Sequence, residues 1–382
     1  MNPSPDLLRL SAEGFIVELR EGHVLLHEIP YVDSSRAIRH GTLITIFQPS
    51  PPAGAFDHRA WFMGAMPCGI DGIPLIGIGG ADAKGLLGTS IPIDRMFSTK
   101  PIEGCYADHY AQLKRYVEII STPATAKDPS AVPVLPKPQE VVVNDDNDVF
   151  MYYDTGSVRS ATQAANLRFK GLRVAIVGVG GTGSYILDLV AKTRVAEIHL
   201  IDADVFSSHN AFRAPGAARK EELDTRPTKI SYLAGHYDVF RKGIVRYETP
   251  ITAQNIDLLA GMNFVFIAVD DGPSRGLIAT WLEAHAVPYV DVGMGLDQNE
   301  AHAIFGQCRV TCWAPGDPPA VLPTDPKSDH DLYRTSIQTA ETNALSAAFA
   351  VMRWKRHIGF YHTEGSEHEI VVNIARNSVC LS

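Results

Sequence analysis

The sequence predicts an α/β protein, in which a doubly wound, mostly parallel sheet follows a small α+β domain. After residue 149, short apolar segments alternate with segments of helical period, which is typical of a parallel sheet with helices on both faces. Before residue 122, apolar and polar residues alternate as they do in half-buried strands. A proline-rich stretch separates these two parts.

That stretch sets the expected domain organisation. It contains five prolines and closes on an acidic, Asn-rich run, a composition that forms a linker or an extended surface strap rather than a packed core. We therefore expect a small β-rich α+β domain over residues 1–122, a linker over residues 123–148, and a larger α/β domain over residues 149–382.

The small domain should begin with a β-hairpin. Residues 14–32, GFIVELREGHVLLHEIPYV, alternate apolar and polar side chains around a turn at Glu21 and Gly22. Residues 40–49 predict another strand, and residues 107–121 predict a helix because apolar residues recur there at helical spacing. No catalytic signature stands out in this part.

The larger domain should contain alternating strands and helices. Its predicted strands are residues 173–179, 197–201, 243–251, 263–269, 288–294, 301–314 and 369–377. Its predicted helices are residues 183–193, 229–240, 274–286 and 343–359, and a polar, proline-rich segment covers residues 315–338.

The composition excludes several classes of protein. Of the 382 residues, 45% are hydrophobic and 20% are charged, as in a globular protein with a sizeable core. The formal net charge of −9 argues against a general nucleic-acid binder. No apolar run predicts a membrane span, the first residues lack a signal-peptide pattern, and the five cysteines are scattered, so we expect a reducing cytoplasm.

A glycine-rich turn joins the first strand of the larger domain to its helix. Gly178, Gly180, Gly181 and Gly183 allow the backbone to turn tightly and to approach a phosphate at the helix N-terminus. Asp202 ends the next strand, at the spacing of an acid that holds ribose hydroxyls. These features predict a nucleotide site, and both NAD and ATP would satisfy them.

Three further side chains favour ATP. Arg213, Lys229 and Asp270 follow three different strand or loop segments that should converge at the carboxyl edge of the sheet. Two cations would offset the charge of a triphosphate, and a carboxylate would hold Mg²⁺. An NAD-dependent oxidoreductase, the alternative enzyme, leaves all three unexplained.

These stretches resemble the ThiF/MoeB family of adenylating enzymes, which shares its fold with ubiquitin-activating enzymes. The matching segments are VGVGGTGS, LIDADVFSSHNAFR, RPTK and AVDDGPSR. The resemblance implies that the four glycines face the phosphates and that Asp202 holds the ribose. It further implies that Asn210, Arg213 and Lys229 contact the phosphates, that Asp270 binds Mg²⁺, and that Arg159 reaches into the site of a partner subunit in a homodimer.

The reaction implied by the resemblance is adenylation of the C-terminal carboxylate of a ubiquitin-like protein. The activated tail would then pass to a thiol of this chain or of a ubiquitin-conjugating-like partner. Cys68, between Pro and Gly in a predicted exposed loop, and Cys105, ahead of a predicted helix, are the candidate thiols. Asp271, where the family has Asn, is interpreted as a helix cap. Since the chain lacks paired cysteines, we expect no structural zinc.

The small domain is similar to the leading domain of some bacterial ThiF-like proteins associated with ubiquitin-like modification. We interpret it as a docking domain for the ubiquitin-like protein or a conjugating partner, and a structural wing that stabilises a dimer is the alternative. A non-catalytic scaffold that binds a ubiquitin-like protein is the non-enzyme alternative for the whole chain.

Overall fold

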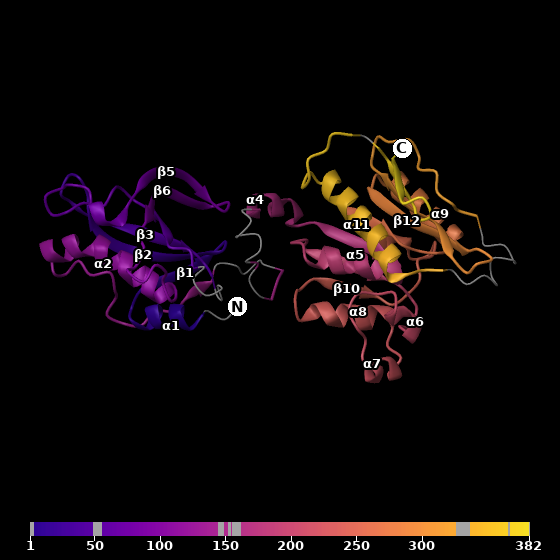
Figure 1. Ribbon diagram of the computed structural model, residues 1–382, viewed down its shortest axis with the longest axis horizontal. Coiled ribbons are helices and arrows are strands. Elements are labelled where there is room, and N and C mark those ends of the chain that lie inside the picture. Colours follow the sequence, from indigo (N-terminus) through magenta and orange to yellow (C-terminus); the bar gives the residue numbers. More distant parts are fainter. Residues whose placement is uncertain are drawn as a thin grey trace. The chain divides into compact units, whose positions relative to one another are not determined.

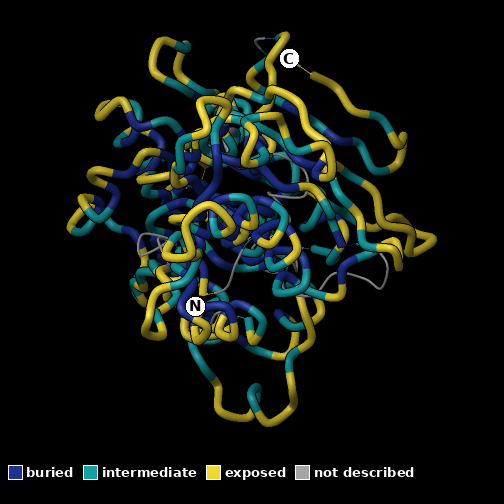
Figure 2. The backbone as a smooth tube through the Cα atoms, turned by 90° about the vertical axis from the view of Figure 1, so that its left-hand side faces the viewer, coloured by how far each residue is buried: buried dark blue, intermediate teal, exposed yellow. Residues whose placement is uncertain are grey.

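A computed structural model describes residues 4–48, 56–143, 149–151, 154, 162–325, 337–365 and 367–381. The chain divides into two units, residues 1–148 with 152–164 and residues 149–151 with 165–382 (Figure 1). In each unit, buried residues alternate with exposed loops and turns along the chain (Figure 2). No helix among the described residues is long and apolar enough to cross a membrane.

The first unit is built on a seven-stranded sheet in the order β5-β6-β4-β3-β2-β1-β7. Neighbouring strands are antiparallel, apart from the parallel pair β1 and β7. The strands are β1 (Ile16–Arg20), β2 (His23–Val32), β3 (Ile38–Ile46), β4 (Arg59–Met63), β5 (Ala81–Leu87), β6 (Ile91–Ser98) and β7 (Val142–Val143). Helices α1 (Pro5–Ala12) and α2 (His109–Lys127) contact the β1–β3 part of this sheet.

The predicted hairpin at the start of this sheet is confirmed. Glu21 and Gly22 join β1 to β2 with φ angles of 45° and 81°, the pair of positive values that a two-residue hairpin turn of type I′ requires. The Glu21 carboxylate accepts hydrogen bonds of 2.7 Å from the hydroxyls of Thr89 and Ser90. The strained turn residue is therefore held by a second loop.

Helix α2 extends beyond the predicted end at residue 121 and passes through Pro123. The hydroxyls of Ser121 and Thr122 donate to the carbonyls one turn back, those of Val117 and Glu118, at 2.7 and 2.5 Å. These bonds fall in the turn where proline cannot donate to the helix. The predicted boundary at residue 122 therefore lies inside a helix.

The segment predicted as a linker packs against the first unit wherever it is described. The Leu135 amide donates to the Gly14 carbonyl and the Gln139 amide to the Ser11 carbonyl, each at 2.9 Å. Strand β7 then pairs with β1. A free linker makes no such contacts, so this part of the chain is a strap, held because its backbone groups pair with those of the unit.

The second unit contains an eight-stranded sheet in the order β10-β9-β8-β11-β12-β13-β14-β15. The first five strands in that order, from β10 through β9, β8 and β11 to β12, are parallel. The next three, β13, β14 and β15, each pair antiparallel with the strand before them, so the sheet is mixed. The strands are β8 (Arg173–Val177), β9 (Glu197–Ile201), β10 (Ile244–Tyr247), β11 (Phe264–Ile267), β12 (Tyr289–Gln298), β13 (Ile304–Trp313), β14 (Glu369–Asn373) and β15 (Ser378–Leu381). The helices are α4 (Gln163–Asn166), α5 (Gly181–Ala191), α6 (Ser208–Ala211), α7 (Lys220–Asp224), α8 (Lys229–Asp238), α9 (Gly272–Ala284) and α11 (Ala340–His357).

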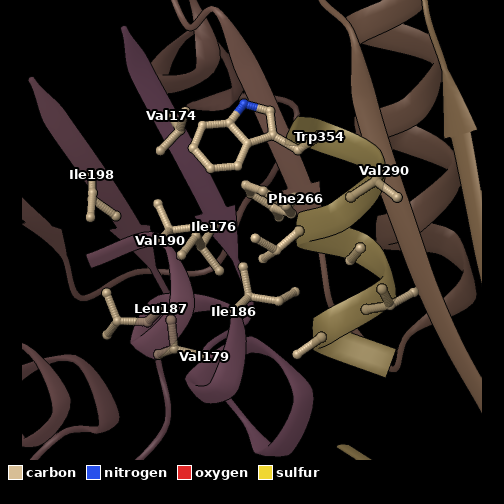
Figure 3. Close-up of a cluster of buried hydrophobic side chains, with 14 of the residues drawn as sticks. Val174, Ile176, Val179, Ile186, Leu187, Val190, Ile198, Phe266, Val290 and Trp354 are labelled. Carbon is tan, nitrogen blue, oxygen red and sulfur yellow. The ribbon is translucent and has the colours of Figure 1, made fainter. Parts of the chain in front are cut away.

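Both faces of this sheet are buried. Alternate residues of β8 enter different clusters: Val174 and Ile176 pack with α5, α8 and α11, and Ala175 and Val177 pack with α9. Figure 3 shows the first cluster, in which Trp354 of α11 lies beside β8 and β11. Continuous burial on both faces explains why these strands are apolar runs rather than alternating patterns.

Candidate active site

A cavity of about 960 Å³ lies at the carboxyl edge of the parallel strands in the second unit. Its walls come from the segments that follow β8, β9 and β11 and from β12. This edge is where open α/β sheets bind ligands. The sequence-predicted residues Gly178, Gly180, Gly181, Asp202, Arg213, Lys229 and Asp270 all line it.

Three glycines of the turn line the cavity, and the fourth lies in the contact between helix α5 and the turn. Gly178 has a φ of 85°, and a side chain there would place its Cβ 2.6 Å from the Ala268 carbonyl oxygen. Gly180 caps the N-terminus of α5, and Gly181 opens the helix. Gly183 does not line the cavity, and its Cβ would lie 1.9 Å from the Gly178 oxygen. Gly183 therefore allows α5 to pack closely on the turn.

The Asp202 carboxylate accepts hydrogen bonds from two backbone amides at the cavity wall. One carboxylate oxygen accepts from the Val179 amide in the glycine turn, and the other accepts from the Asp204 amide, each at 2.8 Å. Asp202 therefore ties the end of β9 to the glycine turn. The ribose contact expected of Asp202 from the sequence stays a prediction.

The two predicted cations come from the connection between β9 and α8 and from the start of α8. Lys229 opens α8 and is 9% exposed, with Nζ 2.6 Å from an Asp204 oxygen and 3.8 Å from an Asp202 oxygen. Arg213 is half-buried at the cavity wall. No described residue accepts a hydrogen bond from its Nε, which is buried. Both side chains bring positive charge to one cavity.

Two other predicted residues take different positions. Asn210 is buried and does not line the cavity, and its Oδ1 accepts from the Ser207 amide at 2.9 Å, which caps α6. The cap uses only Oδ1, and the buried Nδ2 has no hydrogen-bond partner among the described residues. The phosphate contact expected of Asn210 stays a prediction. Arg159 lies outside the described residues.

Asp270 and Asp271 follow β11 and both line the cavity. Asp271 is the N-cap of α9, and its carboxylate accepts from the Ser274 amide at 2.8 Å. The interpretation of Asp271 as a cap is therefore confirmed. Over the described ranges, no three His, Cys, Asp or Glu side chains are grouped to hold a metal ion by themselves.

Replacing Asp271 should cost stability through the lost cap. We expect Asp271→Ala to lower the free energy of unfolding by about 1 kcal/mol, the usual contribution of an N-cap carboxylate. Asp271→Asn is the matched control because its amide oxygen can still accept from Ser274. Equal stability of the alanine variant and the unsubstituted protein in urea unfolding would show that the cap contributes nothing.

Sequence reasoning missed a buried charge cluster in the cavity wall. Asp291 of β12 is fully buried, and its two carboxylate oxygens lie 2.8 Å from Arg275 Nε and 2.5 Å from Arg309 Nη2. Arg275 also donates to the Val269 carbonyl at 2.6 Å, just before Asp270. Burial raises the pKa of Asp291, and both guanidinium groups oppose that rise. An aspartate inside the apolar stretch PYVDVGM was the available signal.

The candidate thiols lie in the first unit. The expectation that Cys68 is exposed is wrong, since it is fully buried and burial raises the pKa of its thiol. The cause is a contact with a distant strand, because the Cys68 amide donates to the carbonyl of Val32 in β2 at 2.8 Å and holds the loop on the sheet. Cys105 is half-buried in the loop before α2, whose first turn is capped by Asp108. Cys308 is buried, Cys312 is half-buried, and Cys380 is exposed.

Burial of Cys68 makes a prediction about its reactivity. At neutral pH we expect iodoacetamide to modify Cys68 at least about 10-fold more slowly than the exposed Cys380, because the reactive form is an accessible thiolate. Mass spectrometry of the two peptides over time gives both rates in one sample, and unfolding in urea should equalise them. Equal rates in the folded protein would contradict the buried position.

Two family models match this chain. A domain of unknown function, DUF6791, matches residues 5–155, and the ThiF family matches residues 157–337. Residues 157–337 form a ThiF-family domain. The resemblance inferred from the sequence is thereby confirmed, and the ThiF match supports nucleotide binding and adenylyl transfer as the class of activity.

The solved structures that are similar to the chain share little sequence identity with it. A crystal structure of Escherichia coli MccB with MccA-N7isoAsn is 16% identical, with a TM-score of 0.47, and covers 57% of this chain and 65% of that one. MccB with ATP is 13% identical, with a TM-score of 0.49 and coverages of 59% and 70%. PaaA is 13% identical, with a TM-score of 0.47 and coverages of 61% and 84%. A comparison with curated proteins gave no match.

Proposed function

We propose that the second unit binds ATP in its cavity and adenylates the C-terminal carboxylate of a peptide or protein. The observation that carries this proposal is the convergence of a helix N-terminus, two cations and a carboxylate on one cavity. In the reaction, a carboxylate oxygen attacks the α-phosphorus of ATP and forms an acyl-phosphate bond. The bond from that phosphorus to the β-phosphate oxygen breaks, and pyrophosphate leaves with its electron pair.

The phosphates would lie at the start of α5. The free amides of a helix N-terminus and its positive dipole end favour an anion. Lys229 would exchange a partner on binding, since its nearest carboxylate, that of Asp204, is 70% exposed. When Asp204 releases Lys229, water can solvate its exposed carboxylate, and a phosphate can take its place beside the buried ammonium group. Arg213 would supply the second positive charge.

Asp270 is the side chain that would hold Mg²⁺. This ion is commonly bound by one or two carboxylates together with the substrate phosphates. Asp270 lines the same cavity as the glycine turn, so a triphosphate at that turn could supply further oxygen ligands beside water. When bound, the ion would offset charge on the phosphate oxygens. The protein's own contribution is to position the reactants and to present donors where charge develops.

We further propose that the substrate is the tail of a ubiquitin-like protein and that the enzyme acts in the cytoplasm as a homodimer, to which Arg159 contributes across the subunits. The buried position of Cys68 favours a partner protein as the final thiol acceptor, with the first unit as the docking domain. Cys105, which is half-buried, is the second thiol that the sequence offers as a candidate, and its substitution would test that role.

Binding and exchange assays test the proposal. Isothermal titration with Mg·ATP and with NADH should give a binding signal for Mg·ATP alone. Exchange of labelled pyrophosphate into ATP should then depend on adding a peptide with a free C-terminal carboxylate, and the same peptide with an amidated C-terminus is the control. Tight binding of NADH without binding of Mg·ATP would replace this proposal with the oxidoreductase.

A further inference from the structure

We propose that Asn343 is a positioning residue that fixes the glycine turn and the Arg213 loop relative to each other, so that both can engage a triphosphate. This inference rests on the proposed function. Asn343 lies in the first turn of α11, beyond the segment that matches the ThiF family. It does not line the cavity, so any effect on a nucleotide passes through its neighbours.

The side chain of Asn343 joins two cavity-lining segments. It is fully buried, and its Oδ1 accepts from the Thr182 hydroxyl at 2.8 Å. Its Nδ2 donates to the carbonyl oxygen of Arg213 at 3.3 Å. One amide group therefore holds the start of α5 with one atom and the Arg213 backbone with the other.

The side chains of Asn343 and Gln338 lie close against Gly181 at the start of α5. A side chain at Gly181 would place its Cβ 2.2 Å from Asn343 Nδ2 and 2.7 Å from Gln338 Oε1. The helices are held in this position by the core in Figure 3, where Trp354 and its neighbours on α11 pack with Ile186 and Val190. A side chain at Gly181 would therefore displace the Asn343 amide from its place between Thr182 and Arg213.

The Arg213 loop needs an external hold because it is long and has little regular structure. Between β9 and α8 it contains only the short helices α6 and α7 among its described elements. The Arg213 amide donates to the Asn210 carbonyl at 3.0 Å, which is a bond within the loop. The bond from Asn343 comes from outside the loop and fixes the backbone that carries the Arg213 side chain.

This geometry predicts a selective effect on the triphosphate. Loss of the Asn343 bridge would loosen the glycine turn and the Arg213 loop, both of which face the phosphates in the proposed site. The adenosine part would depend instead on Asp202, whose bonds to Val179 and Asp204 remain. The affinity for Mg·ATP should therefore fall more than the affinity for AMP.

The test measures both nucleotides with Asn343→Ala. We expect about a 10-fold weaker Kd for Mg·ATP, the effect of losing one or two hydrogen bonds, and less than a 2-fold change for AMP. Ser346→Ala is the matched control, since Ser346 is a buried polar residue one turn further along α11 that bonds to the Thr342 carbonyl within its own helix. Thermal unfolding checks that each variant is folded.

A double-mutant cycle separates the bridge from a direct contact of Thr182 with the ligand. Thr182→Val should weaken Mg·ATP binding, Thr182→Ser should restore it, and Thr182→Val should add little to Asn343→Ala. An unchanged ratio of ATP to AMP affinity in Asn343→Ala would overturn the inference, as would full additivity in the cycle. Failure of the unsubstituted protein to bind either nucleotide would instead overturn the proposed function, and this inference with it.

Discussion

Arg213→Ala and Lys229→Ala should each slow pyrophosphate exchange by on the order of 10²-fold or more, the usual cost of removing one preorganised donor from a reacting group. In the proposed site, these two side chains bring positive charge to the phosphates, and the structure places both of them on the cavity wall. The rate at saturating ATP should fall, because the donors act most strongly on charge that develops during the reaction.

Exposed cations of the same loop provide the controls. Arg219 and Lys220 are exposed and do not line the cavity, so Arg219→Ala and Lys220→Ala should exchange pyrophosphate at the original rate. Circular dichroism and thermal unfolding would establish that all four variants are folded. If a folded Arg213→Ala or Lys229→Ala protein kept full exchange, that residue would have no part in the reaction.

Asp291→Ala should lower the free energy of unfolding of the second unit by about 3–5 kcal/mol, the range measured when one member of a buried ion pair is removed. The variant would leave the guanidinium groups of Arg275 and Arg309 facing a buried gap. Asp291→Asn keeps the size of the side chain and removes its charge, so this variant should lose less of the free energy of unfolding than Asp291→Ala. Urea unfolding followed by tryptophan fluorescence reports on this unit, since Trp281, Trp313 and Trp354 lie within it.

A surface pair on the same unit provides the comparison. Asp224 is 65% exposed and lies 3.4 Å from Lys220 one helical turn away. Exposed pairs of this kind contribute about 0.5 kcal/mol or less, so Asp224→Ala should unfold at nearly the original urea concentration. If Asp224→Ala and Asp291→Ala lowered the free energy of unfolding by similar amounts, burial would not increase the contribution of the Asp291 cluster to stability.

Much of the second unit could be predicted from its sequence because its central strands β8 and β11 are apolar runs with clear ends. The exposed last strand β15 was not predicted. The segment at residues 197–201 was predicted with the bounds of β9, and Lys229 was predicted to open the helix that is α8. Strands that are buried on both faces are easily recognised, and parallel strands bring their carboxyl ends to one edge. Local pattern and sheet geometry together were therefore enough to assemble the cavity from distant residues.

The features that were missed depend on contacts between distant segments. Nothing local in the Cys68 loop indicates that its amide pairs with Val32 and buries the thiol. The path of α2 through Pro123 contradicts the local preference of proline. The partners of Asp291 lie on α9 and β13, so a single charged residue in an apolar run could be noticed but not matched with its arginines.

The bridge between α5 and α11 also has a consequence for the order of folding. Thr182 and Asn343 are 161 positions apart, so a chain synthesised at about 5–20 residues per second would make α5 roughly 8–30 s before the start of α11. During that interval the apolar face of α5 has no helix α11 to cover it, and the Arg213 loop lacks its external hold. The protein should therefore become able to bind a nucleotide late in its synthesis. The strands and the glycine turn that contain most of the proposed site are made earlier.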